Sequence, residues 1–76
     1  MDWDPTDYRW RQVADELARR IRDGVYPVGG TLPSEVELAH ELGTAKMTVR
    51  RALAELRDRG LIRTLHGRGS VVVKAS

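Results

Sequence analysis

The residues of this chain best suited to chemistry are basic, and they lie close together in its second half. Arg50 carries a planar guanidinium that can donate two hydrogen bonds to a guanine in the major groove. Lys46 can donate to guanine or to phosphate, and Thr48 can reach either kind of group. Met47 either touches a thymine methyl group or packs inward, and Arg51 lies nearby. This spacing is typical of the first turns of a DNA recognition helix, with an ordinary solvated helix face as the alternative.

A second basic feature is a glycine-flanked arginine near the end of the chain, Arg68. Gly67 and Gly69 let the backbone approach DNA closely, and an arginine at such a turn suits a narrow minor groove. His66 either adds a contact or is a solvent-exposed histidine at the end of a strand. Ser34, at a predicted helix start, either caps that helix, which is the better supported role, or donates to a phosphate held at the helix N-terminus.

The charge of the chain is divided unevenly along its length. The formal net charge is only +2. Residues 1–43 contain five basic and nine acidic residues, whereas residues 44–76 contain eight basic and two acidic residues. A polyanion would therefore bind the second half, unless the excess is simply a solvated basic face.

The composition favours a small cytosolic protein. Seventy-six residues allow one domain with a marginal core and leave too little interior for a deep substrate cleft. The absence of cysteine excludes disulfides and thiolate metal sites. No apolar run approaches the ~20 residues that span a bilayer, and no signal peptide precedes the first predicted helix. No membrane association is expected.

Other kinds of site lack the residues that they need. His40 and His66 fall on different predicted elements with no third metal ligand arranged nearby. Ser34 has no base partner visible in the sequence for nucleophilic catalysis. The turn at 67–69 lacks the remaining glycine and the strand-to-helix context of a nucleotide-binding loop. We therefore expect no enzyme, no metal and no cofactor.

The first half of the chain predicts one helix after a short tail. Residues 1–7 are expected to be flexible, and residues 8–76 to form the domain. The helix should begin at Pro5 or Thr6, with Asp4 or Thr6 as its cap, and should end at Asp23. Its apolar stripe recurs at three- and four-residue spacing and comprises Val13, Ala14, Leu17, Ala18 and Ile21.

Two more helices follow a loop at residues 25–33, where Thr31 and Leu32 can add a short edge strand. Ser34 and Glu37 form a capping box that starts the first of these helices, and Gly43 ends it. The other helix begins at Thr44 or Ala45 and ends before Gly60. Because only a tight turn around Gly43 separates them, the pair predicts a helix-turn-helix.

The last part of the chain predicts a basic β-hairpin. Strands are expected at residues 61–66 and 70–74, joined by a glycine-rich connection at 67–69. The whole sequence therefore predicts a mainly α fold with a small wing of two or three antiparallel strands, a winged helix-turn-helix. Its recognition helix covers about residues 45–59, and its wing covers residues 61–74.

Residues Tyr8 to Val73 resemble the N-terminal domain of the GntR family of bacterial transcription regulators, most closely its HutC-like branch. The resemblance is carried by YRWRQVADELARRIRDGVYPVGGTLPSEVELAHELG and TAKMTVRRALAELRDRGLIRTLHGRGSVVV. It implies a cytosolic repressor or activator, usually dimeric on a palindromic operator. The matching positions imply phosphate or base contacts, which fall on Ser34, Lys46, Thr48, Arg50, Gly67 and Arg68, and less firmly on His66.

Three positions depart from the family pattern. Val36 stands where the family usually has an arginine that often contacts DNA, so one contact is expected to be missing. Ala45 replaces a serine, which weakens the cap of the third helix by roughly 0.5–2 kcal/mol unless Thr44 takes over. Lys46 replaces an arginine and gives up bidentate geometry. We expect weaker or altered base reading.

Family members usually carry a ligand-sensing and dimerisation domain after the wing, and these 76 residues offer no effector pocket. The chain is either a domain of a longer protein or a short regulator. The rival hypothesis is a protein-interaction module on the same scaffold. Its partner would bind an apolar patch around Trp3, Tyr8 and Trp10, although the two tryptophans could instead cover the end of the core.

Overall fold

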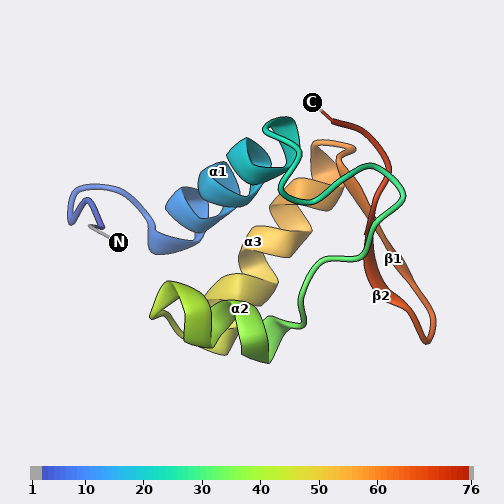
Figure 1. The fold of residues 1–76 in the computed structure, drawn as a ribbon. Helices are drawn as coiled ribbons and strands as arrows, with labels where there is room; N and C mark the ends of the chain where they lie inside the picture. The colour runs from blue at the N-terminus through green and yellow to red at the C-terminus, as the bar shows by residue number, and fades with distance from the viewer. Residues whose placement is uncertain (1–2, 76) are drawn as a thin grey trace.

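The computed structural model describes residues 3–75, so the outer ends of the predicted segments 1–7 and 8–76 lie outside the described residues. Three helices precede a two-stranded antiparallel hairpin (Figure 1). The predicted fold class is confirmed. The elements are α1 (Arg9–Arg22), α2 (Glu35–Leu42), α3 (Lys46–Asp58), β1 (Ile62–Leu65) and β2 (Gly69–Val72).

The core forms where α3 packs between α1, α2 and the hairpin. The predicted stripe of α1 faces the buried side of α3, and Leu38 and Leu42 of α2 cover the same side near the start of α3. Leu32, Ile62 and Val72 close the core under the hairpin. The centre of this core is fully apolar and holds α3 in place, with buried side chains of Val13, Leu17, Ile21, Val49, Ala52, Leu53 and Leu56.

The predicted start of the first helix is wrong. Helix α1 begins at Arg9, and its N-cap residue, Tyr8, makes no side-chain cap hydrogen bond. The Asp4 carboxylate instead accepts from the backbone N–H and the hydroxyl of Thr6, at 2.8 and 2.6 Å. Gln12 then accepts from the Asp4 N–H at 2.7 Å. These local bonds offer the backbone a turn in place of a helix.

The helix-turn-helix is built as the sequence predicts. The Ser34 hydroxyl accepts from the Glu37 N–H at 3.1 Å and caps α2. Gly43 follows α2 with φ of 64°, a left-handed conformation that glycine adopts without a Cβ penalty. Ala45 precedes α3 without a side-chain cap, and Thr44 does not replace it. The start of α3 therefore keeps backbone N–H groups that no side chain satisfies.

The wing is shorter than predicted. Ile62 pairs with Val72 and Leu65 with Gly69, so the connection is formed by residues 66–68 rather than 67–69. The difference arises because Gly69 is itself paired. The expected edge strand is present as one bridge between Thr31 and Val71. None of the helices within residues 3–75 is long and apolar enough to cross a membrane.

Candidate nucleic-acid interface

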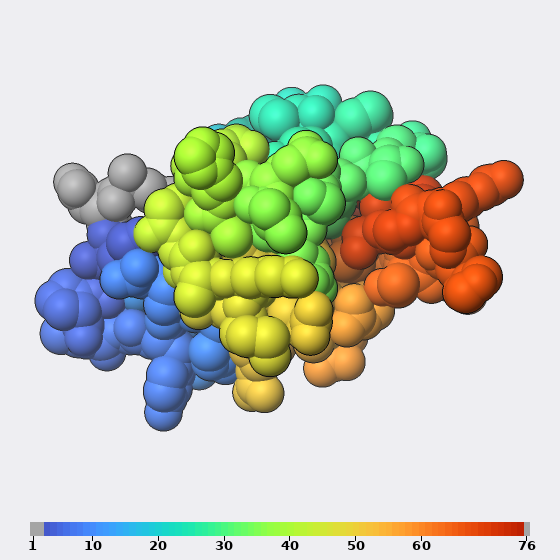
Figure 2. Space-filling view, turned by 90° about the horizontal axis from the view of Figure 1, so that it is seen from below, coloured from blue at the N-terminus to red at the C-terminus, as the bar shows by residue number. Residues whose placement is uncertain are grey.

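One face of the molecule gathers the start of α3, the start of α2 and the wing. Figure 2 looks onto this face from below the view of Figure 1: residues near 45–50 lie at its centre, and the wing projects to one side. Thr48 is half-buried, and the other predicted contact residues are exposed, namely Ser34, Lys46, Met47, Arg50, Arg51, His66, Gly67 and Arg68. The fold thus leaves eight of the nine predicted contact residues exposed.

The first turns of α3 are anchored by Val49, which is fully buried. Lys46 and Arg50 are four residues apart and therefore share one side of the helix. Met47 is 64% exposed, so it does not pack inward. The start of α3 thus exposes two cations and one apolar side chain.

Arg50 is paired with the carboxylate of Glu35 on the neighbouring helix, a pair that was not predicted from the sequence. Its Nη2 and Nε donate to the two carboxylate oxygens of Glu35, at 3.0 and 3.2 Å. The hydrogen bond from Arg50 lowers the pKa of Glu35 against the effect of burial, and the charges of Lys46 and Arg57 act in the same direction. The pair joins the first residue of α2 to α3.

Arg51 lies against an aromatic ring instead of a carboxylate. Its guanidinium carbon is 4.7 Å from the centre of the Trp10 ring, and that of Arg11 lies 5.6 Å from the same ring. Trp3 packs on the core, as one of the two predicted alternatives has it. Only Tyr8, at 65% exposure, is a strongly exposed member of the patch that the rival hypothesis needs. Two arginines cover the indole of Trp10.

A groove of about 440 Å³ runs between the start of α2, the middle of α3 and the wing. Ser34 and Glu35 line it from the start of α2, Arg57 from α3 and Arg68 from the wing. Arg57 also donates to the Thr64 hydroxyl at 2.9 Å, which ties α3 to β1. Arg57 was not among the predicted site residues, although it lies seven residues after Arg50 and thus falls near the same helix face.

The tip of the wing is open. The Arg68 N–H donates to the Leu65 carbonyl at 3.0 Å and closes the turn. Gly67 and Gly69 have φ values of 77° and 73°, and a Cβ added to either would meet nothing within 4 Å. The glycines therefore serve the left-handed turn, and they also leave space beside Arg68 for an approaching backbone.

The chain is similar to known regulators over most of its length. Residues 9–72 match the family model of bacterial regulatory proteins of the gntR family. An uncharacterized HTH-type transcriptional regulator of Rhizobium meliloti is 44% identical over 83% of this chain and 26% of its own length. The histidine utilization repressor of Klebsiella aerogenes is 37% identical over 86% of this chain and 27% of its own. The chain thus spans about a quarter of the length of these relatives.

Solved structures share the fold. A GntR family transcriptional regulator from Listeria monocytogenes has a TM-score of 0.87 and 31% identity, covering 93% of this chain and 62% of its own. The DNA-binding domain of AraR, in complex with operator ORR3, has a TM-score of 0.83 and 26% identity, covering 96% and 88%. Both likenesses extend over the three helices and the wing.

Proposed function

The chain belongs to the GntR family of bacterial regulatory proteins, and from that premise we propose that it binds duplex DNA sequence-specifically as the DNA-binding domain of a transcription regulator. The observation that carries this proposal is the exposed face of Figure 2, on which the start of α3 and the wing are presented together. In a bacterium the complex would form in the cytoplasm, where the chromosome lies.

The start of α3 would enter the major groove. Arg50 would donate to the acceptor edge of a guanine, Lys46 to a neighbouring guanine or phosphate, and Thr48 to a phosphate. Met47, exposed beside them, would contact a thymine methyl group. These side chains supply the sequence information.

The wing would hold the adjacent minor groove or backbone. Arg68 lies in the turn of the hairpin, and a narrow minor groove concentrates negative potential that attracts arginine. His66 and the glycines beside Arg68 would contact the sugar-phosphate backbone. Ser34 and the free N–H groups of α2 would hold one phosphate, with Arg57 across the groove.

Two copies on a palindromic operator are part of the proposal. One domain neutralises few phosphates, so its isolated affinity should be modest and should fall steeply with salt. Two linked copies on paired half-sites gain affinity through effective concentration, without any new contact within each half-site. The spacing of the half-sites then reports the geometry of the dimer.

Selection of bound sites from a random duplex library tests the proposal. The immobilised 76-residue chain should enrich a short motif containing at least one guanine, and Lys46→Ala with Arg50→Ala should abolish that enrichment. Recovery of no motif by the wild-type chain at low salt would overturn sequence-specific binding. The same motif from the double variant would overturn the assignment to α3.

A further inference from the structure

The pair between Glu35 and Arg50 joins two elements of the candidate interface. Glu35 is the first residue of α2, and Arg50 lies in the second turn of α3. The side chains are 28% and 51% exposed, so the pair lies at the surface that faces DNA in the proposed complex. An exposed ion pair contributes little to stability in general. The geometry of the pair therefore points to a role other than stability.

The geometry uses one edge of the guanidinium and leaves the other open. Glu35 accepts from Nε and from Nη2 of Arg50, at distances between 3.0 and 3.3 Å. An arginine has five N–H donors. Glu35 uses the Nε donor and one Nη2 donor of Arg50, and the remaining three donors have no partner among residues 3–75. That end-on edge can match the O6 and N7 acceptors of guanine.

We infer that Glu35 is a positioning residue that aims Arg50 at a guanine and, through its own negative charge, penalises complexes in which a phosphate takes the place of that guanine beside Arg50. The inference rests on the proposed DNA binding and adds how that site discriminates. It places a specificity-determining residue on α2, outside the recognition helix.

Two physical effects give Glu35 this role. An arginine already held in one orientation loses less conformational freedom when it binds a base, so correct contacts gain affinity. The carboxylate also repels phosphate oxygens, so sequence-independent binding loses affinity. Lys46 and Arg57, whose charges help to lower the pKa of Glu35, favour its charged form at neutral pH. Glu35 thus raises the affinity for DNA with the correct guanine and lowers the affinity for random DNA.

The test compares Glu35→Gln with the wild-type 76-residue chain. The probes are the duplex that the wild-type chain selects, single exchanges of each of its guanines, and a random-sequence duplex of the same length. We expect Glu35→Gln to bind the random duplex about twofold to threefold more tightly, because one negative charge is removed. Its discrimination at the guanine contacted by Arg50 should fall about fivefold to tenfold.

Glu37→Gln is the matched control, because Glu37 lies two residues further along α2, is exposed and forms no hydrogen bond or ion pair with Arg50. It removes the same charge and should leave base discrimination unchanged. In an Arg50→Ala background, Glu35→Gln should have no effect on discrimination. Thermal unfolding of each variant shows whether the folded population is the same.

Three results would overturn the inference. Glu35→Gln could weaken specific and random binding equally, as a general structural role would do. It could leave base discrimination unchanged, or it could alter discrimination as strongly when Arg50 is already alanine. If the wild-type chain prefers no guanine at all, the proposed function fails together with this inference, whereas the first three results leave sequence-specific binding intact.

Discussion

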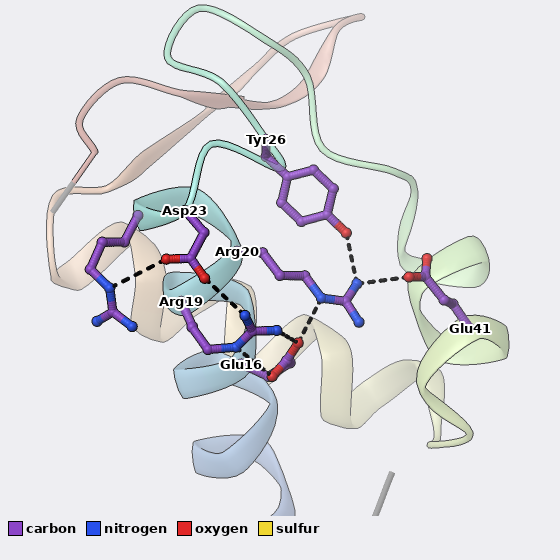
Figure 3. Close-up of polar contacts among 7 residues, drawn as sticks. Glu16, Arg19, Arg20, Asp23, Tyr26 and Glu41 are labelled. Atoms are coloured by element: carbon purple, nitrogen blue, oxygen red, sulfur yellow. Dashed lines mark hydrogen bonds and ion pairs between the residues drawn. The ribbon is translucent and has the colours of Figure 1, made fainter.

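The arginines of α1 and the cations of the start of α3 and the wing have the same chemistry but different surroundings. In α1, Arg19 pairs with Glu16 and Asp23, and Arg20 pairs with Glu16 and Glu41, at 2.7 to 2.9 Å (Figure 3). At the candidate interface, three cations form no ion pair among residues 3–75, namely Lys46, Arg51 and Arg68.

Carboxylates thus neutralise Arg19 and Arg20 on α1, whereas no carboxylate pairs with Lys46, Arg51 or Arg68 among the described residues, so the number of arginines alone does not locate the candidate interface. Arg20 also donates to the Tyr26 hydroxyl at 2.9 Å, so it joins α1 to the following loop and to α2. Burial alone would lower its pKa, and the hydrogen bonds to Glu16, Tyr26 and Glu41 raise it. Arg50 is the exception on the other face, since it is paired and yet presents a free edge.

Removing the Arg50 side chain should have the largest effect on DNA binding. Arg50→Ala should lower affinity for the selected duplex about 10- to 100-fold, because a bidentate guanine contact is lost. Fluorescence anisotropy measures the affinity. The thermal unfolding midpoint of Arg50→Ala should stay close to that of the wild-type chain, because the Arg50 side chain is half exposed. A variant that loses binding by unfolding would contradict this separation of roles.

Arg20→Met should show the opposite pattern. Loss of the hydrogen bonds to Glu16, Glu41 and Tyr26 should lower the free energy of unfolding by about 1–3 kcal/mol. Affinity for DNA, measured well below the unfolding midpoint, should change by less than about twofold, since Arg20 lies away from the proposed contacts. Urea unfolding measures the free energy of unfolding. Arg22→Met is the control, because Arg22 is more exposed and its Nε lies 3.9 Å from the nearer carboxylate oxygen of Asp23. Equal destabilisation by both variants would contradict the claim that the hydrogen bonds of Arg20 stabilise the fold.

Arg68→Ala should weaken binding by a smaller amount, about threefold to tenfold, and should do so for the selected and the random duplex alike if it contacts phosphate. The slope of log affinity against log salt should then become shallower by about 0.9. A reduced preference for A·T pairs beside the motif would show that Arg68 reads the minor groove. An unchanged affinity and slope would exclude the wing tip from the complex.

The smallest expected effect concerns acid stability. The hydrogen bond from Arg19 lowers the pKa of Glu16 in the folded chain, against the effect of burial. The unfolded chain then binds more protons than the folded chain near the ordinary value of 4.5, so stability should fall as the pH drops through and below this range. Urea unfolding at pH 7 and pH 3.5 should show a smaller loss between the two for Glu16→Gln than for the wild-type chain. An equal loss would place the acid sensitivity elsewhere.

Local patterns in the sequence account for most of the fold. The helical stripes, the Ser34 cap and the turn at Gly43 depend on residues within a few positions of each other, and all three are present. The start of α1 escaped prediction because Asp4 and Thr6 form a local turn that competes with the helix. The hairpin connection shifted by one residue, because Gly69 pairs with Leu65 in the ladder.

The candidate site was only partly predictable because its pairs join distant parts of the chain. Arg50 lies 15 residues from Glu35, and Arg51 meets Trp10 across the packing of α1 on α3. Asp15 of α1 pairs with Arg59, the residue after α3, at 3.0 Å, although the two lie 44 residues apart in the chain. Which carboxylate meets which arginine depends on the packing of the helices, and helical spacing alone does not contain it.

Chemical-shift mapping of the ¹⁵N-labelled chain during titration with the selected duplex tests the central claim most directly. We predict shifts at residues 34–36, 46–51 and 66–69, with the backbone around Arg20 and Glu41 unchanged. Shifts around Arg19 and Arg20 of α1, with residues 46–51 and 66–69 unchanged, would contradict the account. The DNA would then lie on the face where these two arginines are already paired with carboxylates.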